Sequence, residues 1–325
     1  MNFTPAPFSP ALPHAPPRFR AEVRAMLLLS APLAGALLAQ MGMGTTDTIL
    51  LGSLGRDALA AGGLGAAMFF FFAGLMQAAC GGIGILIAHA RGADDHARIA
   101  PILRAGFALA AVLTVPVVIA MAAIEPMLDV IGEAPELSRA VARFDRVLML
   151  GAPAALALAA LRMYLAAMDK PRYVLLVALG GLAGNAVLNY GLIYGAWGLP
   201  ELGYLGSATA TAIAVWSMLT VTVTAIWLTP SLRPHFPNGI FAWHGDDTAI
   251  LKELFALGWP IAITTGVEAG LFVAGSLMIG TLGTTQLAAH QVTINMAATA
   301  FMVPLAISQA ANVRVGYHIG SKLPA

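Results

Sequence analysis

An aspartate lies within a long apolar stretch near the start of the chain. Residues 41–52 read MGMGTTDTILLG, and Asp47 is the one ionisable side chain between residues 26 and 52. A carboxylate at membrane depth is costly unless it faces a cavity, finds a partner or takes up a proton. Asp47 is therefore a candidate site for a proton or a cation. The alternative is a packing role, with the carboxylate held by the hydroxyls of the threonines beside it.

Other polar side chains could share this chemistry. Asn185 and Asn189 stand four residues apart in GNAVLNYG, which places them on one face of a helix. An amide can accept from a protonated carboxyl or donate to an ionised one, so both would suit an acid that changes state. Hydrogen bonding between helices is the competing interpretation. Glu268 is a second acid, in the middle of a later apolar run, where we expect it to be buried and to hold a second cation or a cationic substrate. A purely structural acid is the alternative.

Further polar residues in apolar runs are candidates for lining a substrate cavity. They are Gln40, Gln77, Tyr190, Tyr194, His290 and Asn295. Interfacial packing would explain the tyrosines equally well, and for His290 packing or a hydrogen bond between helices is favoured over metal binding. Arg162 is expected to extend its long side chain toward the membrane surface, with pairing to a buried acid as the alternative. We expect no metal site.

The composition indicates what surrounds these residues. The chain has 325 residues, of which 59% are hydrophobic and only 10% charged, with a mean hydropathy of +0.81. Soluble domains carry about 25% charged residues, so this is the composition of an integral membrane protein in a lipid bilayer. A net charge of +1 argues against nucleic-acid partners. The single cysteine, Cys80, reads as a small buried apolar residue. No Walker, GxSxG or HExxH motif suggests an enzyme.

Eight apolar stretches are long enough to cross a bilayer of about 30 Å as helices. They are residues 26–52, 62–89, 102–124, 147–168, 173–196, 204–229, 254–280 and 286–312. None shows the alternation that a membrane barrel requires, so the fold is predicted to be an all-α polytopic bundle. The polar break at 125–146 could include an interfacial helix.

Lys and Arg in the loops predict the orientation. With a cytoplasmic N-terminus, four basic residues lie outside, namely Arg56, Arg139, Arg143 and Arg146. Twelve lie inside: Arg18, Arg20, Arg24, Arg91, Arg98, Arg104, Lys170, Arg172, Arg233, Lys252, Arg314 and Lys322. The excess favours both termini inside.

The chain contains an internal repeat, which appears when its end is aligned with its beginning. LGSLGRDALAA at 51–61 lies on IGTLGTTQLAA at 279–289, with six of eleven residues identical. The same ungapped alignment pairs Pro32 with Pro260 and Gly92 with Gly320. Six spans separate the copies, so both enter the membrane in the same direction, as in transporters with parallel repeats. The second copy is only two helices long, and we expect either a truncated chain, which we favour, or a partner that supplies the missing helices.

Several segments resemble the multidrug and toxic compound extrusion (MATE) family, especially its bacterial branch. They are MGMGTTDTILLGSLGRDALAAGGLG, GNAVLNYGLIYG, FALGWPIAITTGVEAG and LGTTQLAAHQVTINMAATAFMVPLAISQAANVRVGYHIG. The likeness extends over residues 22–320. It implies the first eight helices of a twelve-helix, two-lobe antiporter with parallel six-helix repeats.

The resemblance also implies a function and a domain plan. The expected activity is secondary export of cationic organic compounds in exchange for H⁺ or Na⁺, without a cofactor. The expected cation or proton sites are Asp47, Asn185, Asn189 and Glu268. The expected organisation is a disordered cytoplasmic segment at 1–25, a first lobe at 26–229, a cytoplasmic loop at 230–253 and the start of a second lobe at 254–325. The expected location is the bacterial cytoplasmic membrane.

Two alternatives stay open. A lipid or lipid-linked-sugar flippase of the same superfamily would share the two-lobe plan, but it would need several buried cations for a pyrophosphate group. A truncated remnant or subunit without transport activity is the other alternative.

Overall fold

A computed structural model describes residues 19–236, 245–280 and 284–322. Residues 1–18 of the segment expected to be disordered, and part of the expected inter-lobe loop, lie outside these ranges. Within them the regular structure is entirely helical, as predicted. The helices are α1 (Phe19–Ser53), α2 (Arg56–Ala79), α3 (Gly81–Gly92), α4 (Ile99–Ala122), α5 (Ile124–Ile131), α6 (Pro135–Leu148), α7 (Ala152–Ala167), α8 (Pro171–Tyr194), α9 (Tyr204–Leu228), α10 (Gly245–Gly280) and α11 (Thr284–Lys322).

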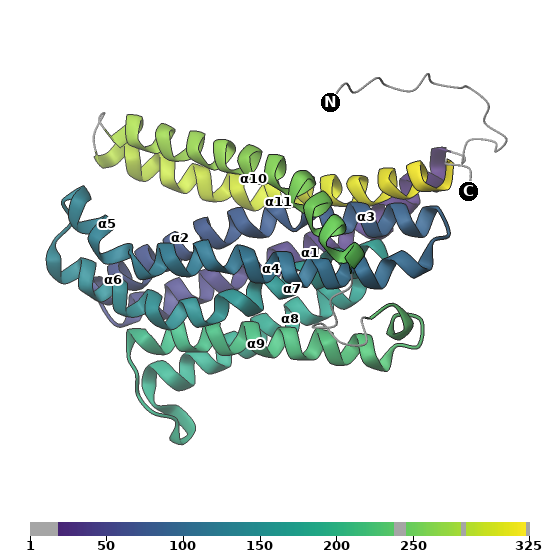
Figure 1. Ribbon diagram of the computed structural model, residues 1–325. Helices are drawn as coiled ribbons and strands as arrows, with labels where there is room; N and C mark the ends of the chain where they lie inside the picture. The colour runs from purple at the N-terminus through teal and green to yellow at the C-terminus, as the bar shows by residue number, and fades with distance from the viewer. Residues whose placement is uncertain (1–18, 237–244, 281–283, 323–325) are drawn as a thin grey trace.

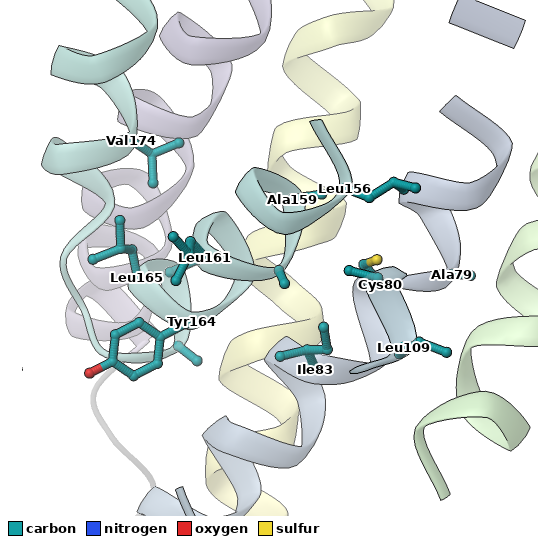
Figure 2. Packing of buried hydrophobic residues seen from close by; sticks show 14 of the residues in the cluster. Ala79, Cys80, Ile83, Leu109, Leu156, Ala159, Leu161, Tyr164, Leu165 and Val174 are labelled. Carbon is teal, nitrogen blue, oxygen red and sulfur yellow. The ribbon is translucent and has the colours of Figure 1, made fainter. Parts of the chain in front are cut away.

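Eight helical segments of the described chain are long and apolar enough to cross a membrane, which confirms the predicted number. The second segment, residues 56–92, consists of α2 and α3 and is broken at Cys80. Cys80 is fully buried among Ala79, Ile83 and Leu109, beside side chains of α7 (Figure 2). Its assignment as a buried apolar residue is therefore confirmed.

The fourth segment is longer than the sequence predicted. It begins at Pro135 because α6 continues through a short 3₁₀ turn, Met149–Gly151, into α7. The basic residues of α6 lie on an exposed face, whereas Phe144 and Asp145 on the other face are buried. Averaged hydropathy hides a helix with two such different faces. Only α5 remains as a short separate helix in the stretch 125–146.

The two last helices lie along one side of the bundle, and α8 and α9 lie along the opposite side (Figure 1). α10 packs against α2 and α4, and α11 packs against α1 and α3. α10 includes residues 245–253, so the expected loop at 230–253 is partly helical.

The repeat in the sequence has a counterpart in the packing of the helices. α1 and α10 each contain the repeated proline, Pro32 or Pro260. α1 of the first copy packs on α11 of the second, and α10 of the second copy packs on α2 of the first, so the contacts between the two copies are equivalent.

Ion pairs hold the two copies together at the end of the bundle where α1 begins. The Arg104 guanidinium makes two hydrogen bonds to the Asp247 carboxylate, at 2.8 and 3.0 Å, and Arg98 pairs with Glu253 at 2.9 Å. Arg314 of α11 contacts the Glu22 carboxylate of α1 at 2.7 Å. These pairs link the start of α10 to α4 and the end of α11 to α1.

Candidate functional site

Asp47 lies about two turns before the end of α1, and only 7% of it is exposed. The Nδ2 of Asn189 donates to Asp47 Oδ1 at 2.8 Å, and the Thr211 hydroxyl donates to Oδ2 at 3.1 Å. Three helices, α1, α8 and α9, therefore meet at this carboxyl group. Both of its oxygens have a neutral hydrogen-bond donor.

The two asparagines are fully buried on the same face of α8, as their spacing predicted. Asn185 donates from Nδ2 to the Thr211 hydroxyl at 3.2 Å, and so orients that hydroxyl toward Asp47. The carbonyl oxygens of both asparagine side chains have no hydrogen-bond partner within the described residues. Buried carbonyl oxygens are normally paired, and these two are not. Each could therefore accept a hydrogen bond from a proton donor or bind a cation.

The neighbouring threonines do not hold the carboxyl group. Thr45, Thr46 and Thr48 donate to the backbone carbonyls four residues earlier in α1, at 3.1, 2.9 and 2.8 Å. The interpretation of Asp47 as an acid held by local hydroxyls is therefore wrong. Its partners come from other helices.

A cavity of about 70 Å³ opens beside Asp47, inside the bundle. This volume could hold a few waters or an ion, whereas sites for drug-sized molecules measure about 300 Å³ or more. Its walls come from α1, α2, α7, α8 and α9, and their polar side chains are Gln40, Asp47, Gln77, Arg162, Thr211 and Thr222.

Arg162 and Gln40 form the second polar part of the cavity. The Nη1 of Arg162 donates to Gln40 Oε1 at 3.1 Å, and its Nε is buried without a partner within the described residues. Arg162 thus points into the cavity, and the expectation that it extends to the membrane surface was wrong. Gln40 precedes Asp47 by seven residues, or about 10 Å along the helix. The cavity therefore holds a carboxylate and a guanidinium about two turns apart.

Five predicted site residues lie elsewhere. Glu268 is exposed on α10, so the expectation that it is buried was wrong. Tyr190 and Tyr194 are 48% and 38% exposed, with ring centroids 5.0 Å apart, and neither lines the cavity. Asn295 is exposed on α11.

His290, also on α11, is half-buried, and its Nε2 has no partner within the described residues. It does not line the cavity beside Asp47. Of the predicted residues, the structure thus brings together Asp47, Asn185 and Asn189, with Gln40 and Gln77 in the same cavity.

The sequence did not predict the contact of Thr211 with Asp47 or the direction of the Arg162 side chain. A threonine in an apolar helix usually bonds to its own backbone, as Thr209 does to the Leu205 carbonyl at 2.8 Å. Nothing in ATATAIA distinguishes the two threonines except the helix face on which each lies.

The fold and the site define a polytopic helical membrane protein with a buried carboxyl group beside a cavity. The sequence model of the MatE family matches residues 32–191 and 260–325. The chain belongs to this family, as its sequence motifs predicted.

Similar proteins include the probable multidrug resistance protein NorM of Burkholderia mallei (strain ATCC 23344). It is 46% identical over 322 residues, which cover 99% of this chain and 68% of that protein. The multidrug resistance protein NorM of Burkholderia vietnamiensis is 47% identical over 311 residues, covering 95% of this chain and 66% of that protein. The chain spans about two thirds of the length of these relatives.

Solved structures have the same fold. The eukaryotic MATE transporter AtDTX14 superposes with a TM-score of 0.82 at 17% identity, over 93% of this chain and 66% of that one. An outward-facing multidrug resistance MATE family transporter of the MOP superfamily superposes with a TM-score of 0.78 at 21% identity, over 92% and 65% of the two chains. At these identities the likeness shows the fold alone.

Proposed function

We propose that the chain is part of a secondary active efflux transporter, which exports cationic organic compounds in exchange for H⁺ or Na⁺. The relatives at 46% and 47% identity are named as multidrug resistance proteins, which supports this class of activity. The observation that carries the proposal is the buried Asp47 carboxyl group with its Asn189 and Thr211 partners.

The chemistry of this site suits a singly charged ion. The Asp47 carboxylate has only neutral hydrogen-bond partners and no cation in contact with it, so a proton or a monovalent cation would neutralise its charge. The free amide oxygens of Asn185 and Asn189 add two hard oxygen ligands for Na⁺. Binding of the ion at Asp47 would thus change the charge of the cavity without any covalent chemistry.

The exported compound needs a different place. The cavity beside Asp47 is too small for a drug-sized cation, so we assign it to the coupling ion. Glu268 is our proposed second cation or substrate site, since its carboxylate is exposed on α10 and accessible to a larger ligand. We likewise propose Tyr190, Tyr194, His290 and Asn295 as residues of a separate substrate cavity.

We assign residues 26–229 to a first lobe and 254–325 to the start of a second. We place both termini on the cytoplasmic side of a bacterial inner membrane. The twelve basic residues on the proposed inner side, against four on the outer side, support this orientation. In it, Asp47 lies near the outer end of α1.

A flippase for lipid-linked pyrophosphates is less well supported. Such a cavity would need several cationic side chains, whereas Arg162 is the one cationic side chain among the described residues that line the cavity beside Asp47. The cavity contains an acid as well, which would repel a phosphate group.

Efflux of ethidium from proteoliposomes tests the proposal. The purified chain would be reconstituted, and an inward Na⁺ or H⁺ gradient would be imposed in separate experiments. We expect ethidium efflux with at least one gradient and none with the Asp47→Asn variant. Absence of efflux under both gradients would contradict transport by this chain alone and favour a remnant or a subunit.

A further inference from the structure

A groove of about 610 Å³ opens at the end of the bundle where α1 begins. Its lining residues come from α1, from α8 with the short loop before it, and from α11. α1 lies next to both other helices, since α8 and α11 each pack on it. Three of the lining side chains are basic, namely Lys170, Arg172 and Arg314, and one, Asp169, is acidic. We call this space the basic groove.

The acids at the basic groove already have arginine partners. Asp169 pairs with Arg91, whose Nη1 also donates to the Ala167 carbonyl at 2.8 Å. The Nη2 of Arg314 donates to both carboxylate oxygens of Glu22, at 2.7 and 2.8 Å. Each carboxylate is thus matched by a guanidinium, and neither is left to neutralise the other basic side chains.

Lys170 and Arg172 are those other basic side chains. Neither forms an ion pair with another described residue. They lie on either side of Pro171, the first residue of α8, where the chain enters a membrane segment. Basic pockets of this kind, between membrane helices at the bilayer surface, bind the phosphate groups of anionic lipids. The charge of the basic groove therefore fits an anionic headgroup.

A second groove, which is mostly apolar, continues from the first along α8. It has a volume of about 420 Å³, is lined by α8 and α9, and shares Tyr173 and Leu176 with the basic groove. Gly180 and Gly184 leave it open, since a Cβ at either position would meet nothing within 4 Å. From Tyr173 to Leu188 it follows α8 for about 22 Å. One leaflet contributes about 15 Å to the hydrocarbon core, so this apolar groove is long enough for an acyl chain.

The walls of both grooves favour a phospholipid over a free phosphate ion. Leu28 and Leu176 line the basic groove with side chains that are 56% and 65% exposed. In the apolar groove, the Ser217 hydroxyl donates to the Ile213 carbonyl of its own helix at 2.8 Å, so it offers no donor to an anion. A molecule with a charged phosphate and a long apolar chain would match the two grooves together, whereas an inorganic ion would use only one.

We propose that the basic groove and the apolar groove form a binding site for one anionic phospholipid. Lys170 and Arg172 bind the phosphate of the headgroup, and an acyl chain lies along Gly180 and Gly184. In the proposed orientation this lipid belongs to the cytoplasmic leaflet. The site does not depend on ion binding at Asp47, so it can be tested independently of the proposed transport activity.

Native mass spectrometry of the purified chain in a neutral detergent tests the site. Dioleoyl phosphatidylglycerol and dioleoyl phosphatidylcholine are titrated separately, because they share their acyl chains and only the first has a net charge. We expect one phosphatidylglycerol to bind per chain, more tightly than phosphatidylcholine. A lysine or arginine beside an anionic lipid contributes about fivefold in affinity. Lys170→Gln/Arg172→Gln should therefore bind phosphatidylglycerol about thirtyfold more weakly and phosphatidylcholine as before.

Lys252→Gln/Arg233→Gln is the matched control. It also removes one lysine and one arginine, from exposed positions at the same end of the bundle that do not line the basic groove. It should keep the affinity of the unaltered chain for phosphatidylglycerol. Lys170→Arg/Arg172→Lys retains both charges and should keep it as well. Equal losses in the groove variant and the control, or no preference for phosphatidylglycerol in the unaltered chain, would overturn the site.

Gly180→Leu tests the apolar groove. Its side chain would take the space of about two CH₂ groups of the lipid, so both phospholipids should bind about tenfold more weakly. Unchanged affinity for both would overturn the placement of the acyl chain. Inorganic phosphate is the third probe. If it displaces phosphatidylglycerol at an equal concentration, the ligand is the phosphate ion alone, and the lipid site is overturned.

Discussion

Gly92 and Gly320 occupy equivalent positions in the two copies of the repeat, and each contacts the backbone of the helix that carries the other. A Cβ atom at Gly92 would collide with the carbonyl of Tyr317, and one at Gly320 would collide with the carbonyl of His89. Tyr317 is itself the repeat equivalent of His89. The two copies of the repeat therefore meet in a symmetric contact between α3 and α11, which leaves no room for a side chain at either glycine.

This contact predicts that Gly92→Ala destabilises the protein. The added methyl group must displace backbone, and overpacking of this kind costs about 1–3 kcal/mol. Thermal unfolding of the purified chain in detergent would measure the loss. Gly63→Ala is the control, because a Cβ at Gly63 meets nothing within 4 Å. Equal unfolding temperatures for the two variants would contradict the symmetric contact.

The ion pairs between the two copies of the repeat should differ in how much they contribute to the free energy of unfolding. Asp247 is fully buried and the Arg104 side chain is 11% exposed, whereas the side chains of Arg98 and Glu253 are 41% and 43% exposed. Arg104→Met would leave a buried carboxylate without its guanidinium and should cost about 3–5 kcal/mol. Arg98→Met should cost less than about 1 kcal/mol. Chemical unfolding of both variants checks the ranking, and a larger loss from Arg98→Met would contradict it.

Stability should depend on pH through His235, which lies between two membrane segments. Burial, together with the neighbouring His96 ring at 5.4 Å, lowers the pKa of His235. The unfolded chain, with a histidine pKa of about 6.5, then binds a proton more readily than the folded chain. The contribution of His235 to stability is therefore present above about pH 6.5 and is lost as the pH falls through its lowered pKa.

The His235→Phe variant retains a ring that can stack on His96 but cannot be protonated. Its thermal stability should fall less on acidification than that of the unaltered chain. Parallel pH profiles for the two proteins would show that His235 does not contribute.

Arg162 should weaken cation binding at Asp47. The guanidinium and the carboxylate line one cavity, about 10 Å apart by the helical spacing of Gln40 and Asp47. At an effective dielectric constant of about 20, two unit charges at that distance interact by roughly 1.5 kcal/mol. Repulsion by the guanidinium should therefore lower the affinity for a cation at Asp47 about tenfold. Arg162→Met should therefore lower the Na⁺ concentration at half saturation by about that factor. Arg143→Met, at an exposed position on α6, should leave it unchanged.

The sequence predicted the parts of this site that depend on spacing along one helix. Asn185 and Asn189 were expected on one face of α8, and both contribute to the cluster around Asp47. Thr211 was not predictable, because the orientation of a hydroxyl depends on which helix packs against it. The direction of Arg162 also depends on packing, since the same long side chain could reach the surface or the cavity. Glu268 was expected to be buried from hydropathy alone, which does not show which face of α10 is covered.

The long fourth segment shows the same limit of prediction from hydropathy, which does not distinguish the faces of a helix. The charges of α6 lie on an exposed face, so averaged hydropathy placed the segment's start at residue 147 and not at Pro135. For this reason Asp145 was counted with a polar loop, although it is fully buried in the bundle.

The most direct test of the account is ion binding by the chain itself, with and without the Asp47 carboxyl group. Isothermal titration with Na⁺ and measurement of proton uptake would be carried out on the unaltered chain, on Asp47→Asn, and on Glu133→Gln as a control at an exposed position. We predict that the unaltered chain and the control bind one ion per chain and that Asp47→Asn binds none while retaining its unfolding temperature. Undiminished ion binding by folded Asp47→Asn would contradict the central claim.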